Sequence, residues 1–308
     1  MASALFISKN LYSQACCTSG STFLGGLERG GINYSSLSFS IGYEFNNLNS
    51  SYNGTTKIDD PFQRNADVQN ITLGIEYGLT ERMSVLVIPT LLVTKNREIT
   101  VKDSANMSQK KKFTGTGFGD IILFGKYRLT NRSVFTTFEL DLGLGVKLPT
   151  GSFTKEDNGT RIPIDLQPGN GAIELINSLY FIKQFPKLKL NLYGNVSYRY
   201  IGANFDGYKV GDELFASAFV NYGLLKFLNP SVGLRSRYAK RDFAEGRLLP
   251  STGSYSVFVI PGITYSEGPL NINVYYQIPL HRNIRGIQLT VSEVIGAEVQ
   301  YIIFTQPP

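Results

Sequence analysis

The sequence contains a single histidine, His281, so any acyl-transfer or protease site that uses a histidine would have to be built around it. His281 is followed directly by Arg282 and is interpreted as a solvated loop or rim residue. The sequence holds no GxSxG, no HExxH and no phosphate-binding loop between a strand and a helix. Gly115, Gly117 and Gly119 are interpreted as turn glycines. We therefore predict no catalytic residues, no cofactor and no enzymatic activity.

The only two cysteines, Cys16 and Cys17, are adjacent and follow a short apolar stretch that ends on Ala15. This pattern favours a remnant of a signal peptide over residues 1–15, although the stretch is short and no basic residue precedes it. Three fates of Cys16 stay open, namely lipidation, a disulfide bond or a free thiol. Two cysteines without further ligands predict no metal site.

Charged and polar side chains alternate with apolar ones along most of the chain. Between residues 37 and 45 the odd positions carry Leu, Phe, Ile, Tyr and Phe, whereas the even positions carry Ser, Ser, Gly and Glu. A period of two indicates strands of a sheet with one apolar and one polar face. Strands are predicted at 37–46, 70–79, 83–94, 118–129, 134–148, 172–183, 187–200, 212–225, 230–241, 254–265, 270–281 and 287–304.

The connections between these segments alternate between long and short. Long polar connections cover 47–67, 95–117 and 149–171, while short ones cover 80–82, 130–133 and 184–186. Strands of this length and this alternation are typical of transmembrane barrels with long extracellular loops and short periplasmic turns. We predict an all-β fold, a transmembrane antiparallel up-and-down β-barrel of about twelve strands, over residues 34–304. Residues 16–33 are expected to form a periplasmic N-terminal segment or a plug.

The polar face of the predicted strands carries charges of both signs. They are candidates for lining the lumen and selecting solutes. An alternative, compatible interpretation is a ladder of ion pairs that fills and stiffens a narrow lumen. The candidates are Glu44, Glu76, Lys126, Arg128, Glu139, Asp141, Lys147, Lys189, Arg199, Glu213, Arg235, Arg237 and Glu298.

Some inward positions are apolar, and three prolines fall inside predicted strands. The apolar positions favour either a path for a hydrophobic solute or packing against an inward-folded segment; they are Leu86, Ile88, Leu92, Phe215, Phe219, Phe258 and Ile260. Pro89, Pro261 and Pro279 each remove a hydrogen bond from the sheet and predict bulges in the wall. An opening in the wall beside one of them is the alternative.

Two motifs carry a resemblance to a known family. Residues 117–129 read GFGDIILFGKYRL and residues 144–151 read LGVKLPTG, followed by DLQPGNG at 165–171. This region resembles the MetA-pathway of phenol degradation family of outer-membrane barrel proteins. The resemblance implies a channel or carrier for small molecules, with hydrophobic or aromatic solutes as candidates. It supplies no binding residues.

Together these observations predict a bacterial outer-membrane channel that passes small, hydrophobic or aromatic solutes passively. The alternative is a non-conducting barrel that serves as an assembly partner or surface scaffold. The expected partners are outer-membrane lipid, a small-molecule solute and proteins that contact the loops or the N-terminal segment. The net charge of +6 is modest. Apart from the loop at 95–112, the basic residues are scattered singly among the strands, so no nucleic-acid partner is expected.

Overall fold

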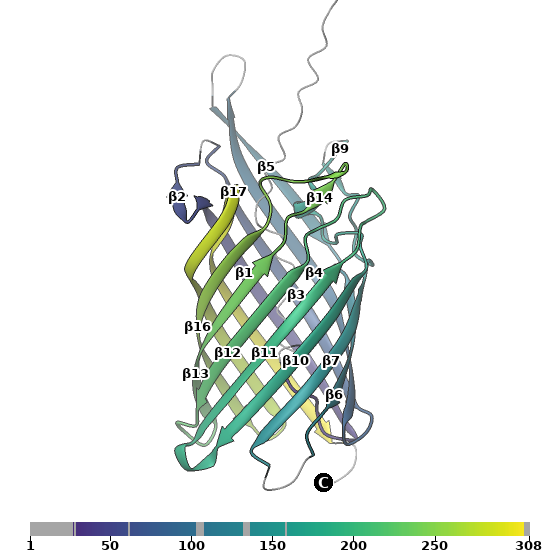
Figure 1. Ribbon diagram of the computed structural model, residues 1–308, viewed down its shortest axis with the longest axis vertical. Coiled ribbons are helices and arrows are strands. Elements are labelled where there is room, and N and C mark those ends of the chain that lie inside the picture. The colour runs from purple at the N-terminus through teal and green to yellow at the C-terminus, as the bar shows by residue number, and fades with distance from the viewer. Residues whose placement is uncertain are drawn as a thin grey trace, which may run out of the picture.

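The structure is a computed structural model that describes residue 27 and residues 29–60, 62–102, 108–131, 136–157 and 159–304. In this part of the chain, eleven antiparallel strand elements form a closed ring (Figure 1). They are β1 (Ser36–Gly54), β3 (Asn65–Gly78), β4 (Met83–Lys102), β6 (Ile121–Arg128), β7 (Phe138–Leu148), β10 (Glu174–Phe185), β11 (Leu190–Ile201), β12 (Glu213–Tyr222), β13 (Leu228–Ala239), β16 (Ser254–Glu267) and β17 (Leu270–Phe304).

The ring closes between β1 and β17, which pair from Ser36 opposite Phe304. The first half of β17 pairs with β16, and the second half, from Ile284 onward, pairs with β1. A straight strand of 35 residues would be roughly 115 Å long. Instead β17 folds back at Gly286, whose φ is +68°, and Arg282 donates a hydrogen bond to the Val291 carbonyl across the fold. β17 therefore runs the height of the barrel twice, as two antiparallel segments. Counted in this way, the barrel has the twelve strand segments that the sequence predicts.

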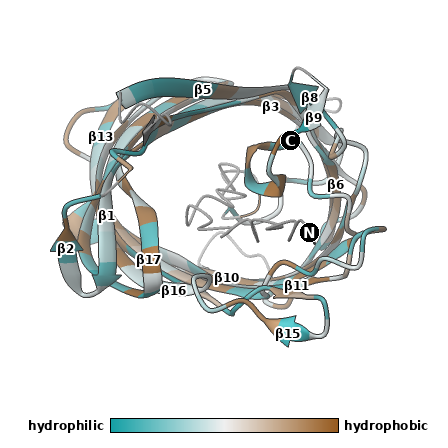
Figure 2. Cartoon of the chain, turned by 90° about the horizontal axis from the view of Figure 1, so that it is seen from above, coloured by the Kyte–Doolittle hydropathy of each residue, from teal (hydrophilic) through white to brown (hydrophobic). Residues whose placement is uncertain are grey.

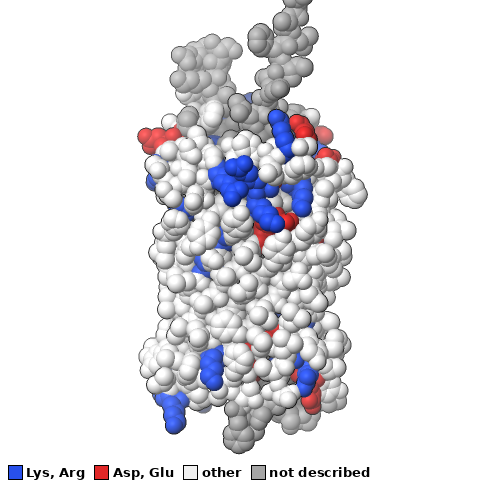
Figure 3. All heavy atoms as spheres, in the orientation of Figure 1, with Lys and Arg blue, Asp and Glu red and all other residues white. Residues whose placement is uncertain are grey.

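Alternation of side chains gives the barrel a polar interior and an apolar exterior. Along β3, the residues from Ala66 to Gly78 alternate between buried and partly exposed positions, with Glu76 inside and Tyr77 outside. Exposed leucines, isoleucines and valines cover the outside of nearly every strand. Figure 3 shows a largely uncharged band between charged ends. A water-exposed apolar surface of this size would aggregate, whereas hydrocarbon stabilises it. No helix among the described residues is long and apolar enough to span a membrane.

Two predicted extracellular loops are partly strands. The segment predicted as a loop at 95–117 forms a hairpin, because β4 continues to Lys102 and β5 (Ser108–Gly117) pairs back along it. Figure 1 shows this hairpin rising above the rim. Likewise, β1 continues to Gly54 and pairs with β2 (Thr56–Ile58). The lysines of β5 are exposed, so the hairpin lies in water and lacks the apolar signal on which the prediction depended.

The remaining elements are two or three residues long and lie at the extracellular end or in a turn. They are β8 (Glu156–Asp157), β9 (Thr160–Arg161), η1 (Ile164–Leu166), η2 (Pro186–Leu188), β14 (Phe243–Ala244) and β15 (Arg247–Leu248). Of these, η1 lies inside the ring when the barrel is seen from above (Figure 2). The carbonyl oxygen of Leu166 lies only 1.9 Å from where a Cβ of Gly115 would be. Gly115 is therefore a close-approach residue of β5, and the prediction that it lies in a turn was wrong.

Candidate functional site

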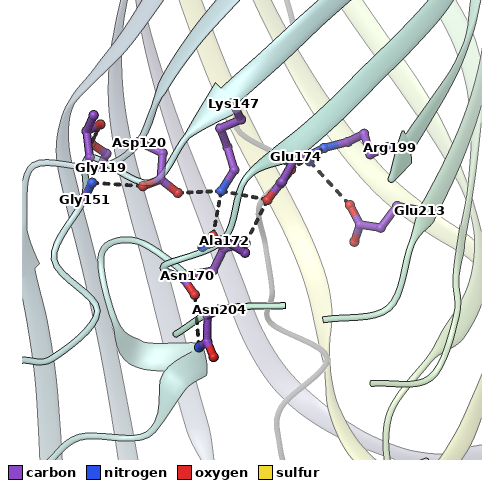
Figure 4. A network of polar contacts seen from close by, with 11 residues as sticks. Gly119, Asp120, Lys147, Gly151, Asn170, Ala172, Glu174, Arg199, Asn204 and Glu213 are labelled. Carbon is purple, nitrogen blue, oxygen red and sulfur yellow. Dashed lines mark hydrogen bonds and ion pairs between the residues drawn. The ribbon is translucent and has the colours of Figure 1, made fainter. Parts of the chain in front are cut away.

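A chain of ion pairs runs around the inner wall at the extracellular end of the lumen (Figure 4). Lys147 Nζ lies 2.5 Å from Asp120 and 2.7 Å from Glu174. Arg199 in turn lies 2.5 Å from Glu174 and 3.4 Å from Glu213. Glu213 also pairs with Arg237. We call this set the upper network; it consists of Asp120, Lys147, Glu174, Arg199, Glu213 and Arg237.

The sheet register explains why these side chains meet. Glu174 of β10 is opposite Lys147 of β7, and Arg199 of β11 is opposite Glu213 of β12. Each neighbouring strand thus contributes a side chain of opposite sign at nearly one height. Buried carboxylates and cations require such partners, since an unpaired charge away from water is costly.

The loop at 149–171 folds inward onto the upper network. Asn170 accepts a hydrogen bond from Lys147 at 3.0 Å and donates one to Glu174 at 2.8 Å. The amide of Gly151 donates to Asp120 at 2.9 Å. Asp165, in η1, pairs with Arg97 of β4 on the other side of the loop. This loop therefore narrows the extracellular end of the lumen.

A cavity of about 70 Å³ remains between the loop and the wall. Its lining combines the upper network with apolar side chains, among them Val93, Ile122 and Ile164. The cavity is large enough for several water molecules next to the network while the loop stays in place.

A second group of charges lies at the periplasmic end. Lys126 Nζ lies 3.1 Å from Glu76, and Arg128 lies 3.5 Å from Glu139 and 3.6 Å from Asp141. We call this set, together with Glu298, the lower network. The described part of the N-terminal segment, Leu27 and residues 29–33, contacts it from inside the barrel.

The contacts of this segment reach several strands. The amide of Gly31 donates to Asp141 at 2.7 Å, and its carbonyl accepts from Arg128 at 2.9 Å. Arg29 pairs with Glu298 of β17 and donates to Gln300 at 2.9 Å. A cavity of about 140 Å³, lined by Arg29 and the wall of β1, β3 and β17, remains beside the segment. The segment thus narrows this end of the lumen and leaves space next to itself.

Between the two networks, the inner wall carries two apolar clusters. One consists of Leu86, Ile88, Ile122, Phe124 and Ile176, with Leu27 of the N-terminal segment. The other consists of Phe258, Ile260, Tyr275 and Val294, with Phe219 and Val291 packed against it. At least two strands separate β4, β6 and β10 from β16 and β17 in either direction around the ring, so the clusters lie on different sides of the lumen.

Comparison with known proteins decides the family. The model of the family described as "Putative MetA-pathway of phenol degradation" matches residues 84–283, which is more than half of the chain. The chain belongs to this family. The match extends well beyond the motifs at 117–171 that carry the resemblance in the sequence.

Among solved structures, the COG4313 outer membrane channel from Pseudomonas putida F1 is similar to this family member, with a TM-score of 0.68. The identity is 13%, over 89% of this chain and 97% of that chain, so the likeness shows the fold. A Pseudomonas aeruginosa FadL homologue has a TM-score of only 0.43 at 10% identity, over 86% of this chain and 90% of that chain. No curated protein matches. The family, the fold and the apolar exterior identify an outer-membrane β-barrel.

Most of the residues predicted to line the lumen face inward in the structure. Glu76, Lys126, Arg128, Glu139, Asp141 and Glu298 lie in or beside the lower network, whereas Lys147, Arg199, Glu213 and Arg237 lie in the upper one. Two others contact neutral partners, since Glu44 accepts from Tyr275 at 2.8 Å and Arg235 donates to Gln277 at 2.9 Å. Lys189 instead lies at the exposed turn, because η2 delays the start of β11 to Leu190.

A bulge in β4 explains why one inward position was predicted wrongly. Ile71 pairs with Leu92 and Thr72 with Thr90, so Leu91 is an extra residue. The bulge reverses the side-chain alternation. Leu92 therefore faces outward with 38% of its surface exposed, while Lys95 and Arg97 turn inward and are buried.

The three strand prolines have different surroundings. The bulge at Leu91 lies two positions after Pro89, and Leu280 bulges directly after Pro279. Pro261 pairs with Val232 in an unshifted register with β13. Each proline retains a partner residue on at least one neighbouring strand, and a lateral opening at these sites stays a prediction.

Sequence reasoning missed several charged residues of the lumen. Glu174 is flanked by the exposed side chains of Ile173 and Leu175, so the alternation alone contained the signal for an inward carboxylate. Asp120 precedes β6, but it falls in the strand predicted at 118–129 with the same alternation as Lys126 and Arg128, so the signal was present there too. Asp165 lies outside the strands, where periodicity carries no information. His281 is exposed, with its ring 6.0 Å from that of Tyr255. Among the residues described, no group of acidic, histidine or cysteine side chains could hold a metal ion. Cys16, Cys17 and residues 1–15 lie outside the described residues.

Proposed function

We propose that this barrel is a passive outer-membrane channel for small uncharged solutes with an apolar or aromatic body. The observation that carries the proposal is the order of side chains along the lumen, in which two charge-paired networks enclose a stretch that contains two apolar clusters. The channel needs no cofactor and performs no catalysis in this proposal.

Charge balance supports an uncharged solute. The upper network contains three carboxylates and three cations, each within ion-pair distance of a partner. Selectivity for one sign of ion arises where a ring of like charges lines a pore. A ring of alternating and paired charges has little net field at its centre, and so favours neither anions nor cations.

The apolar clusters support an apolar or aromatic body. Phe258, Ile260 and Tyr275 on one side and Phe124 and Ile122 on the other offer surfaces on which such a solute loses contact with water. Pockets that bind small molecules commonly combine apolar walls with a few polar groups. The name of the family, which refers to phenol degradation, points in the same direction.

A non-conducting barrel is the second candidate. The inward loop and the N-terminal segment, which both contact the inner wall, favour a plugged lumen that would serve protein assembly. The cavities beside both elements favour the channel instead, because a plug would exclude the solute from this space.

The solute class can be tested by block of ion current through the refolded protein in a planar bilayer, with phenol as the probe. We expect phenol to reduce the current in a saturable manner, whereas a small sugar at the same concentration leaves it unchanged. Ile260→Asn should raise the half-blocking concentration of phenol by about tenfold, since it removes an apolar contact. The matched control is Ile287→Asn at the exposed extracellular fold of β17. Equal block by both solutes, or equal behaviour of both variants, would contradict the proposed class.

A further inference from the structure

The outer wall carries a cationic groove just below the extracellular loops. Four cations line it, namely Lys209, Lys240, Arg241 and Arg285, together with Asp212, Gly211, Phe243 and Leu248. The space between them is about 430 Å³. Figure 3 shows a cluster of Lys and Arg near the top of the visible face, above the uncharged band. With one carboxylate against four cations, the groove is strongly positive.

The groove opens toward the lipid, not toward the lumen. Its cations contact tyrosines of the outer face: Lys209 Nζ lies 4.5 Å from the ring centre of Tyr200, and Lys240 Nζ lies 5.7 Å from that of Tyr198. Arg285 donates a hydrogen bond to the Tyr238 hydroxyl at 3.5 Å. The side chains on the inner face of the same strands, such as Arg199, belong to the upper network instead.

The register of the sheet places the groove at the height of lipid headgroups. Tyr198, Leu214, Tyr238 and Tyr255 are successive cross-strand partners on β11, β12, β13 and β16, so they form one row on the outer face. Aromatic rows of this kind lie at the interface between hydrocarbon and headgroups. Lys240 follows the end of β13 at Ala239, two positions beyond Tyr238, which sets the groove one step further from the hydrocarbon.

We propose that the groove binds the phosphate headgroup of a phosphorylated glycolipid in the outer leaflet. Arginine and lysine provide the charge-assisted hydrogen bonds that phosphate oxygens accept. The acyl chains of the same lipid would lie along Leu214 and the tyrosine row below the groove, while Phe243 and Leu248 cover the sugar side. A soluble anion would gain the charge contacts alone, so the lipid is the occupant that uses both surfaces.

Asp212 fixes the groove without cancelling its charge. It accepts hydrogen bonds from Lys240 at 3.0 Å, from Tyr198 at 2.9 Å and from the Ile201 amide at 3.2 Å. Burial opposes ionisation of Asp212, but these donors outweigh it and hold its pKa below the usual range. Asp212 therefore remains an anion that holds Lys240 against the wall, while Arg241 and Arg285 stay exposed to the headgroup region.

The test is binding of lipid A, a bisphosphorylated glycolipid, to the full-length folded barrel in detergent, measured by native mass spectrometry. The groove variant combines Lys240→Gln, Arg241→Gln and Arg285→Gln. We expect its dissociation constant for lipid A to rise on the order of 100-fold, because each cation near an anionic lipid contributes about 1 kcal/mol of binding free energy. The matched control combines Lys110→Gln, Lys111→Gln and Lys112→Gln in the exposed hairpin strand β5, with the same change in net charge. Its dissociation constant should not change.

Two further probes identify the source of the phosphate. Lipid A from which both phosphates have been removed should bind the unmodified barrel far more weakly than lipid A itself. Inorganic phosphate at the same concentration as lipid A should not displace it. Equal loss of binding in both triple variants, no loss in either, equal binding of the dephosphorylated lipid, or displacement by equimolar phosphate would each overturn the proposal.

Discussion

At the scale of single residues, Glu174 is the central carboxylate of the upper network, because it neutralises two cations at once. Its two carboxylate oxygens lie 2.7 Å from Lys147 and 2.5 Å from Arg199, and its side chain is almost wholly buried. Asp120 and Glu213 pair with the far sides of the same cations and cannot occupy the position between them. The continuity of the upper network therefore depends on this carboxylate.

Glu174→Gln should destabilise the folded barrel by about 3 kcal/mol, since removing one partner leaves buried charge uncompensated. The measurement is urea unfolding in lipid vesicles, followed by the migration of folded and unfolded forms on a gel. Glu156→Gln, in the exposed loop strand β8, is the matched control and should leave the stability unchanged. Equal stability of both variants would show that the upper network contributes nothing to the fold.

Prediction from the sequence worked at this scale wherever strict alternation holds. Lys147, Arg199 and Glu213 were predicted to face inward and do so, because the pairing of β10 with β7 and of β11 with β12 contains no bulge. Leu92 was predicted to face inward and does not, because the extra residue Leu91 reverses the alternation. Lys95 and Arg97 were missed because residues 95–117 were predicted to be a loop. A bulge depends on local hydrogen bonding that the hydrophobic pattern does not encode. Pairing between residues of different strands likewise depends on register, which hydrophobicity alone leaves open.

At the scale of elements, two segments reach into the lumen from opposite ends. The loop at 149–171 is held by Asn170 and Gly151, while the N-terminal segment is held by Arg29 and Gly31. Arg29 is the segment's link to β17, since it contacts both Glu298 and Gln300. The sequence predicts an N-terminal segment or plug over residues 16–33, but it contains no sign of which strands this segment contacts.

Arg29→Ala should loosen the N-terminal segment and raise the mean single-channel conductance by about twofold, because a narrow constriction limits ion flow. The same recording should show more frequent fluctuations between current levels. Arg82→Ala is the control, as Arg82 lies exposed at the turn between β3 and β4. If both variants conduct like the unmodified protein, the segment does not limit the current.

At the scale of the whole molecule, the closed ring with an apolar exterior was predictable because the alternation of polar and apolar residues is repeated in all twelve predicted strands. A single bulge or a misplaced strand end changes a few side chains but not the period of two along the rest of the chain. With an even number of crossings, both ends of the barrel domain lie on the same side, and β1 can pair antiparallel with β17 to close the ring. The width left open inside could not be predicted, because it depends on how the loop at 149–171 and the N-terminal segment pack.

The measurement that tests the central claim most directly is the single-channel current of the refolded, full-length protein in a planar bilayer. A passive channel with paired lumen charges predicts steady current steps, with potassium and chloride permeating about equally. Ion selectivity is read from the reversal potential between two salt concentrations, and folding is verified by β-type circular dichroism. Absence of current from folded protein would contradict the channel and favour the plugged barrel. Strong selectivity for one ion would contradict the balanced upper network.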